Sequence, residues 1–304
     1  MLYYFLKYYV RFTLLLFCKR ITIHNKKDFQ LDGPLLIGAN HPNSFFDAIL
    51  VGTYMRVPVH FMTRSDVFRF KAVRFILSRL QMIPVYRIRD GKDKLSLNEQ
   101  SFREARKSLR KKHHVLIFVE GFCNYQTTLQ PLKKGGARIL DQSWQEQLPV
   151  KMLPLWIRYN SFHDFGKEID LITGTSFGIE EMPTGTDAGS RILEINRQTA
   201  GQLQNLSQTP SPKNKLTGST WLAPFAILGF ILHVPFYFLF APAIRRTFRK
   251  SVHYDSVLFS LLSLFYPLWL ALFGLMAFLL GGIVLGISAI VILPLTARAF
   301  VLWK

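Results

Sequence analysis

The feature that most constrains this chain is a run of 42 residues, Ser256 to Ala297, that contains no charged side chain. A helix of roughly 20 apolar residues crosses a bilayer, so this run is long enough to cross twice. Gly281 and Gly282 lie near its middle, and glycine readily adopts the backbone angles of a tight turn. The simplest interpretation is a transmembrane helical hairpin over residues 251–304, because its helices bond their backbone groups internally.

A second uncharged segment, Trp221 to Ile244, precedes the hairpin, but three prolines interrupt it. The basic cluster Arg245–Lys250 follows at once. If residues 221–244 crossed the membrane once from a cytoplasmic domain, this cluster would reach the far side, against the positive-inside rule. We therefore expect residues 221–250 to form a re-entrant or interfacial segment with a basic cluster, and the hairpin to return to the cytoplasmic side.

Residues 1–20 are also apolar and aromatic, with Lys7 and Arg11 four positions apart on one helical face. The segment lacks the small-residue cleavage site of a signal peptide. It predicts a membrane-associated N-terminal helix that lies in the interface. A spanning helix is the alternative, since a lysine can extend its ammonium group to the headgroups.

The charge balance agrees with a membrane protein. Lys and Arg number 38 against 19 Asp and Glu, a formal net charge of +19, and 49% of the residues are hydrophobic. Such a chain favours an anionic membrane surface or phosphorylated lipids as partners. We expect no nucleic-acid partner, since the sequence has no zinc spacing, recognition helix or aromatic RNA-binding signature. Two cysteines, Cys18 and Cys123, cannot form a disulfide framework, which favours a reduced, cytoplasmic domain.

Residues 21–205 alternate between strand-like and helix-like stretches, which predicts an α/β domain with a mixed sheet covered by helices. Residues 206–220 are polar and contain two prolines, so they are interpreted as a linker. The expected strands are 35–39, 57–62, 82–85, 115–119, 152–157 and 169–173, and the expected helices are 45–55, 66–80, 95–112, 134–147 and 188–205.

The first candidate site follows the strand at 35–39. His41 should lie in a loop and Asp47 in the first turn of the next helix, where a histidine and a carboxylate can act as a base and its orienting partner. The alternative is structural: Ser44 and Asp47 have the spacing of a capping box, and His41 to Asn43 could be only a turn.

Three further positions could contact an anion. Arg87 follows the strand at 82–85, and arginine binds phosphate oxygens in a bidentate manner, although it could be ordinary surface charge. Glu120 and Gly121 follow a buried strand, where α/β sheets place ligands, or they form only a strand-ending turn. Lys133 lies in a loop that opens a helix.

Pro154 interrupts a strand, which normally marks the edge of a sheet.

Taken in order, four pieces of the sequence resemble the motifs of the glycerolipid acyltransferases, the family of the 1-acylglycerol-3-phosphate and glycerol-3-phosphate acyltransferases. His41 with Asp47 resembles the first motif, and Ile83 to Arg87 the second. Phe118 to Gly121, continuing to Pro131–Gly135, resembles the third, and Leu153–Leu155 the fourth.

The sequence departs from the family pattern at three places. Five residues separate His41 from Asp47, where four are common; the longer spacing is similar to a branch that includes fungal glycerol-3-phosphate/dihydroxyacetone-phosphate acyltransferases. Val119 replaces the proline of the third motif. Phe122, Cys123 and Asn124 stand where the common form has Thr-Arg-Ser, so one phosphate-binding arginine is missing.

The resemblance implies a membrane-bound O-acyltransferase of phospholipid biosynthesis. His41 would take the proton of a glycerol hydroxyl, Asp47 would orient its ring, Arg87 and Lys133 would hold the acceptor phosphate, and Glu120 and Gly121 would shape the glycerol pocket. The acyl donor would be acyl-CoA or acyl-ACP, with no metal or other cofactor. The alternatives are an acyltransferase for another lysolipid, such as a lyso-aminolipid, and a non-catalytic membrane lipid-binding protein.

Overall fold

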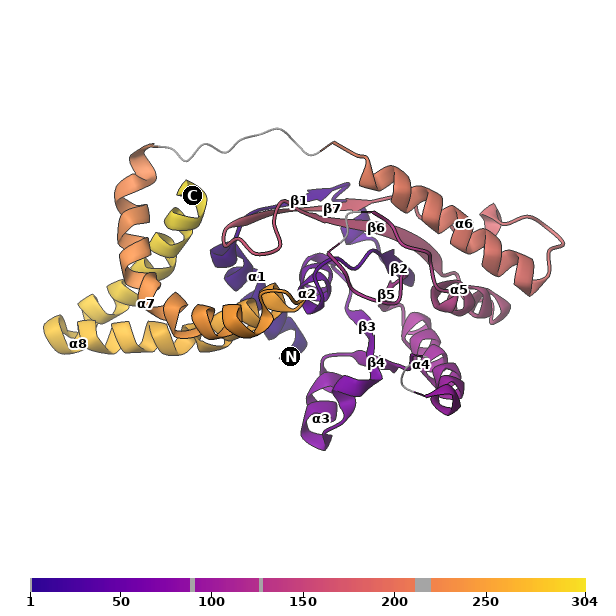
Figure 1. Ribbon diagram of the computed structural model, residues 1–304, viewed down its shortest axis with the longest axis horizontal. Coiled ribbons are helices and arrows are strands. Elements are labelled where there is room, and N and C mark those ends of the chain that lie inside the picture. Colours follow the sequence, from indigo (N-terminus) through magenta and orange to yellow (C-terminus); the bar gives the residue numbers. More distant parts are fainter. Residues whose placement is uncertain (1, 88–90, 126–127, 211–219) are drawn as a thin grey trace.

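The computed structural model of the chain describes residues 2–87, 91–125, 128–210 and 220–304. Its centre is a seven-stranded sheet, and Figure 1 shows the helices around it. The strand order is β1 (Cys18–His24), β7 (Lys167–Thr173), β6 (Lys151–Tyr159), β2 (Leu35–Ala39), β5 (His114–Phe118), β3 (Val59–Arg64) and β4 (Met82–Val85).

The strands from β6 to β4 run parallel to one another, whereas β7 is antiparallel to β6 and β1 is parallel to β7. The predicted α/β fold with a mixed sheet is therefore confirmed. Because parallel strands end at the same edge, the residues that follow β2, β3, β4, β5 and β6 meet there. Side chains from several strands can therefore contribute to one site at this carboxyl edge.

Helices cover both faces of the sheet. Leu36 and Ile37 are neighbours in β2 but belong to different cores, because successive strand residues point to opposite faces. On the Ile37 face pack α1 (Leu2–Phe17), α2 (Phe45–Tyr54) and the beginning of α8 (Tyr254–Trp303). The Leu36 face carries α4 (Asn98–Arg110), α5 (Gly135–Gln145) and α6 (Ala188–Ser207).

The remaining elements are peripheral. Helix α3 (Lys71–Arg79) lies beside β4. Short 3-10 helices occur at η1 (Asp28–Gln30), η2 (Ser65–Phe68), η4 (Lys92–Leu97), η5 (Ile179–Glu181) and η6 (Thr220–Leu222).

The N-terminal helix is shorter than expected. It ends at Phe17, and Cys18 already belongs to β1, whereas the sequence pattern placed residues 1–20 in one helix. The β-branched residues of the next stretch, Ile21 to Ile23, pair with β7 along their whole length. Tertiary pairing with a strand almost 150 residues away thus decides where the helix ends.

The expectation that Pro154 marks a sheet edge is wrong. Strand β6 lies between β7 and β2, in the interior of the sheet. Pro154 is tolerated because its missing N–H faces the β7 side, where the ladder with β7 has not yet begun: that ladder runs from Leu155 to Tyr159. The Pro154 carbonyl on the same side accepts from the Gly174 N–H at 2.9 Å.

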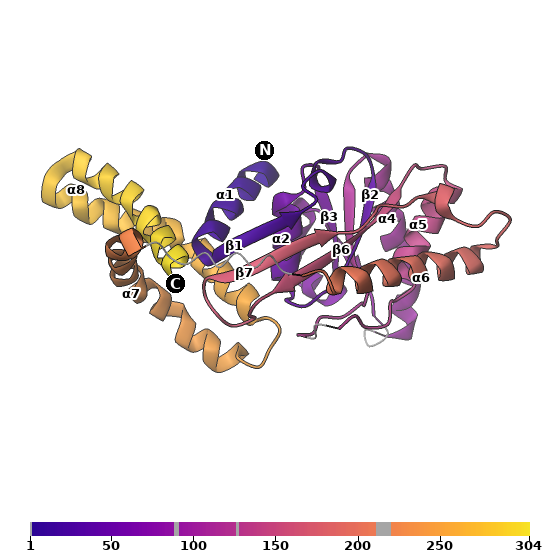
Figure 2. The same ribbon diagram turned by 90° about the horizontal axis from the view of Figure 1, so that it is seen from above.

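Two C-terminal helices are long and apolar enough to cross a membrane: residues Thr220–Phe248, which include α7 (Ala223–Phe248), and α8. The α8 helix is broken at Gly281 and Gly282, where the φ of Gly282 is +76°. There the chain reverses, and the two limbs of α8 run side by side at one end of the molecule (Figures 1 and 2). Gly274 and Gly286 allow this close packing, since a Cβ at Gly286 would lie 3.1 Å from the Gly274 carbonyl oxygen.

The predicted linker, residues 206–220, lies mostly outside the described residues. Its first two residues complete α6.

Candidate active site

The site begins where β2 ends. The Asn40 side chain extends the pairing of β2 with β6: it accepts from the Ile157 N–H at 2.7 Å and donates to the Ile157 carbonyl at 2.9 Å. Asn40 is buried, so this double bond fixes the backbone just before His41. The chain then turns and enters α2, with Asp47 in its first turn, as the sequence predicts.

His41 and Asp47 form a hydrogen-bonded pair. The His41 Nδ1 lies 2.9 Å from Asp47 Oδ2, which also accepts from the Asn43 N–H at 2.8 Å. The other carboxylate oxygen, Oδ1, accepts from the Tyr159 hydroxyl at 2.6 Å. An ionised carboxylate can only accept hydrogen bonds, so a carboxylate at Asp47 requires the proton on His41 Nδ1, and the neutral ring then presents the lone pair of Nε2.

The ring of His41 is held on a second side. It stacks on Phe118 with a centroid distance of 3.6 Å and an angle of 8° between the planes. The side chain is still 18% exposed. A substrate hydroxyl could therefore reach Nε2 without moving the ring.

The capping box that Ser44 and Asp47 could form is not made. The Ser44 side chain makes no capping bond; its Oγ lies 2.5 Å from Nδ1 of His253. The N–H of Phe46, at the start of α2, instead donates to the Ser256 hydroxyl at 3.0 Å. The spacing of this loop therefore serves the His41–Asp47 pair rather than the helix cap.

Glu120 and Gly121 follow β5 beside His41. Glu120 is buried, and its Oε1 accepts from the Gln130 N–H at 3.1 Å. Burial raises the pKa of the Glu120 carboxyl, while the Gln130 N–H and the nearby His41 oppose that rise. Gly121 has φ +74°, and a Cβ there would lie 2.8 Å from Cγ of Lys133. The structure thus brings Glu120, Gly121 and Lys133 together.

Arg87 lies at the same carboxyl edge, after β4. It pairs with Asp66 at 3.2 Å, and the same carboxylate binds Arg64, the last residue of β3, at 2.5 Å. The charge of Arg64 also helps to lower the pKa of His253, after burial and before His41. The edge therefore carries two neighbouring guanidinium groups that share Asp66, and the charge of one of them, Arg64, acts on His253.

Two residues of this site were not found from the sequence. Tyr159 gave no local signal, because its partner Asp47 is far away in the chain. Arg64 did give one: like Arg87, it is a basic residue at the end of an apolar strand. The strand was expected to end at residue 62, so Arg64 was not considered.

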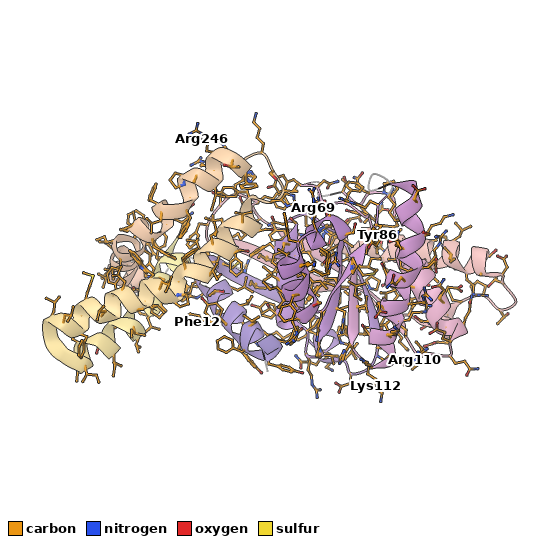
Figure 3. All side chains as sticks on the ribbon, turned by 90° about the horizontal axis from the view of Figure 1, so that it is seen from below. Phe12, Arg69, Tyr86, Arg110, Lys112 and Arg246 are labelled. Atoms are coloured by element: carbon orange, nitrogen blue, oxygen red, sulfur yellow. The ribbon has the colours of Figure 1, made fainter. Side chains whose placement is uncertain are left out.

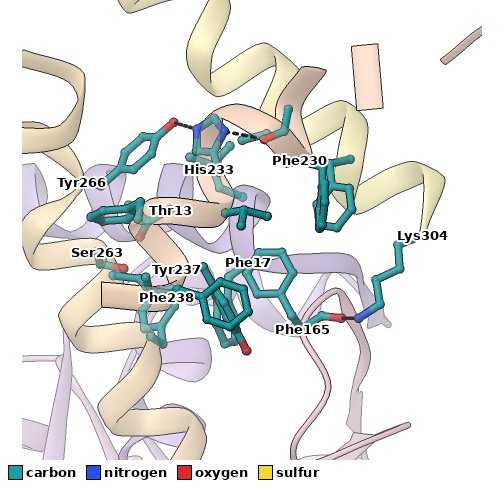
Figure 4. A pocket seen from close by; sticks show the side chains of 18 residues that line it. Thr13, Phe17, Phe165, Phe230, His233, Tyr237, Phe238, Ser263, Tyr266 and Lys304 are labelled. Atoms are coloured by element: carbon teal, nitrogen blue, oxygen red, sulfur yellow. Dashed lines mark hydrogen bonds between the residues drawn. The ribbon is translucent and has the colours of Figure 1, made fainter. Parts of the chain in front are cut away.

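An apolar cavity of about 350 Å³ lies between α1, α7 and α8 (Figure 4). Phe17 and Phe259 line it, and both rings pack edge-on against Phe46, the neighbour of Asp47. At its margin Lys304 donates to the Phe165 carbonyl at 2.9 Å. The cavity thus lies one aromatic layer behind the His41–Asp47 pair.

Comparison with known proteins identifies the chemistry of this domain. Residues 20–158 match the family model described as Acyltransferase. These residues form an acyltransferase domain. All four motifs quoted from the sequence fall within the matched residues, so the prediction of an acyltransferase enzyme is confirmed.

A crystal structure similar to this chain is that of the 1-acyl-sn-glycerophosphate (LPA) acyltransferase PlsC from Thermotoga maritima. The sequences are 14% identical, the TM-score is 0.47, and the similarity covers 69% of this chain and 81% of that chain. No curated protein sequence matches the chain. Both C-terminal apolar helices lie outside the residues that match the acyltransferase family.

Proposed function

We propose that this acyltransferase moves an acyl chain from a thioester, acyl-CoA or acyl-ACP, to a glycerol hydroxyl of lysophosphatidate or glycerol-3-phosphate at a membrane surface. The observation that carries the proposal is the His41–Asp47 pair at 2.9 Å, which leaves Nε2 as the ring nitrogen for the acceptor. Cationic side chains at the same edge suit a phosphate on that acceptor.

The reaction would be direct transfer. His41 Nε2 takes the proton of the acceptor hydroxyl while the hydroxyl oxygen attacks the thioester carbonyl carbon. The carbon–sulfur bond then breaks, and His41 returns its proton to the leaving thiolate. Asp47 keeps the ring in the required tautomer and stabilises the imidazolium that forms between these steps.

The phosphate would be bound by Arg87, Arg64 and Lys133. Cys123 stands where the common family pattern has an arginine, and its sulfur accepts from the Ser44 N–H at 2.9 Å. It therefore supports the loop and supplies no charge. Arg64 is close enough for its charge to act on the Cys123 thiol, so it could replace the missing cation. Glu120 and Gly121 would border the glycerol part.

Several features support a membrane location. The limbs of α8 expose large apolar side chains, including Leu280 at 83% and Val284 at 75%. Such surfaces are unusual in contact with water and typical of contact with lipid. Helix α1 likewise exposes Phe5 and Tyr8, at 68% and 67%. The cavity behind Phe46 offers apolar surroundings for acyl chains.

The contacts of α7 favour an interfacial course rather than a single crossing. Near its start, Phe230 packs against Phe300. At its end, the Arg249 carbonyl lies 2.9 Å from Nε2 of His163 in the catalytic domain. Arg298 binds the carbonyls of Leu15 and Cys18. The end of α7 and both ends of α8 thus lie near the domain, whereas the turn at residues 281–282 is remote from it (Figure 2).

The basic residues next to α7 would then face anionic headgroups beside the site. In Figure 3 Arg246 lies on one side of the molecule, whereas Arg110 and Lys112 of the α4 region lie on the opposite side. Arg106 and Arg110 pair with Glu146 at 2.7 and 2.8 Å, as expected for a solvated face. With the cluster at Arg245–Lys250 on the cytoplasmic side, the catalytic domain would be cytoplasmic as well.

The test is thiol release from an acyl thioester by the purified full chain in lipid vesicles. Lysophosphatidate, glycerol-3-phosphate and a lyso-aminolipid are compared as acceptors, each with acyl-CoA and acyl-ACP. His41→Ala should reduce turnover on the order of 10²- to 10⁴-fold, because it removes the general base.

The chain offers a matched control, because His24 and Asp170 form a second histidine–carboxylate pair at 3.3 Å. His24→Ala should leave turnover unchanged. Transfer only to the lyso-aminolipid would overturn the proposed acceptor. Equal turnover in His41→Ala and wild type would overturn the mechanism.

A further inference from the structure

The segment that joins α7 to α8 reaches into the loop between His41 and Asp47. His253 contacts the Ser44 hydroxyl, and the Ser256 hydroxyl accepts from Phe46 N–H at 3.0 Å and donates to the Asn43 carbonyl at 3.3 Å. Between them, Asp255 Oδ2 accepts from the Asn43 side-chain amide at 2.7 Å. Residues more than 200 positions away thus supply the contacts that a helix start usually obtains locally.

Asn43 is the centre of these contacts. Its backbone N–H holds Asp47 Oδ2, and its side chain is fully buried, so that side chain does not touch a substrate. The amide Oδ1 has no hydrogen-bond partner among the described residues. The bond from Nδ2 to Asp255 is therefore what fixes the Asn43 side chain, and with it the turn that presents His41.

Asp255 is fixed by a second buried charge. The Lys167 ammonium at the start of β7 donates to the same Oδ2, and the two side chains are 0% and 1% exposed. Lys167 also donates to the Ser161 carbonyl at 3.3 Å. A buried ion pair contributes little net stability, because desolvating both charges offsets their attraction. The effect of the Lys167–Asp255 pair is geometric, because β7, α8 and the loop between His41 and Asp47 all meet at Asp255 Oδ2.

We propose that Asp255 and Lys167 are positioning residues of the acyl-transfer site, so that the docked start of α8 sets the geometry of His41 and Asp47. This inference rests on the proposed function of that pair. The C-terminal helices would then help to position the catalytic residues, in addition to contacting the membrane.

Two double variants isolate the positioning effect. Asp255→Leu with Lys167→Met removes both buried charges and leaves Asn43 without an acceptor. Asp255→Asn with Lys167→Met also removes both charges, but its amide oxygen can still accept from Asn43 Nδ2. Neither variant leaves an unpaired buried charge, so both should fold. The Leu/Met variant should melt at a lower temperature than the Asn/Met variant, because it leaves the buried Asn43 amide without an acceptor.

The kcat values should differ. We expect the Leu/Met variant to turn over about 10- to 100-fold more slowly than the Asn/Met variant, because displacement of a catalytic group by about 1 Å has effects of this size. The KM values for acceptor and thioester should agree between the two, since neither residue touches substrate. Equal kcat values in two folded variants would refute the positioning role.

A third variant covers the case in which either double variant fails to fold. Asn43→Ala keeps the Lys167–Asp255 pair and removes only the amide that it holds. It should show a comparable loss of kcat relative to the wild type, with a lower melting temperature because a buried hydrogen bond to a carboxylate is lost. Unchanged kcat in the folded variant would overturn the inference.

The inference can also fail separately from the proposed function. The ring signals of ¹⁵N-labelled His41, measured without turnover, should shift in Asn43→Ala and stay unchanged in the control His24→Ala. Inactivity of the wild type with every thioester, together with shifted ring signals, would reject the proposed function and retain the link from Asp255 to His41. Unshifted signals would reject the link itself.

Discussion

Replacing Asp47 by asparagine removes the charge of the catalytic pair and keeps its shape. The asparagine oxygen can occupy the position of Oδ2, where it still accepts from the Asn43 N–H and from His41 Nδ1, at 2.8 and 2.9 Å in the wild type. Its amide nitrogen then faces the Tyr159 hydroxyl, which can turn its proton away and accept. We therefore expect the fold and the position of the His41 ring to persist.

The expected loss of rate follows from the distance between the charges. At 2.9 Å and an effective dielectric constant of about 20, a full imidazolium–carboxylate attraction is about 6 kcal/mol. If about half of the positive charge has developed in the transition state, the loss is about 3 kcal/mol. Since 1.36 kcal/mol corresponds to a factor of ten, kcat should fall about 100-fold.

The assay is turnover at saturating acceptor and thioester, with the melting temperature of the same sample. Asp170→Asn is the matched control, because it makes the same change in the His24–Asp170 pair and should retain wild-type kcat. An Asp47→Asn enzyme that is folded and retains kcat within about threefold would refute the argument, since a 3 kcal/mol effect cannot be that small.

Two further predictions concern stability and acceptor binding. Burial lowers the pKa of the fully buried His114 from 6.5 to about 4, so between those values the unfolded chain binds a proton that the folded chain does not. From His114 alone the folded state should lose up to about 3 kcal/mol as the pH falls from 6.5 to 4. Burial also lowers the pKa of His60 to about 4, so His114→Gln should reduce the slope of the melting temperature over this range without abolishing it, and an unchanged slope would contradict the assignment. Gly121→Ala places a Cβ at φ +74°, which costs roughly 1–2 kcal/mol, and 2.8 Å from Cγ of Lys133. Its melting temperature should fall and its KM for a phosphorylated acceptor should rise with little change in kcat, whereas an unchanged KM would show that Lys133 does not contact the phosphate.

Local patterns predicted much of this protein. The runs at 35–39 and 82–85 are strands with those bounds, and His41 and Asp47 lie in the loop and first helical turn that were expected. These features depend on residues that are neighbours in the chain. Arg64 could have been found in the same way, had the strand been extended by two residues.

Other features could not be read from local pattern. A proline within a strand predicts an edge strand, but Pro154 lies in an interior strand, at a position that the ladder with β7 does not reach. The apolar N-terminal pattern predicts a helix that continues past Phe17, but Cys18 pairs with β7 and the helix ends there. In both cases the neighbouring strand, which is remote in sequence, decides the result.

The sequence by itself thus determined the motifs, the family that they resemble, the α/β alternation and the apolar C-terminal segment. Only the tertiary structure decided that Tyr159 binds Asp47 and that Asn43, Lys167 and Asp255 meet at one buried oxygen. The physical reason is that a buried polar atom must find its partner wherever packing brings one. The packing of α8 against the sheet decides which atom becomes that partner, and a periodic pattern in the sequence does not predict it.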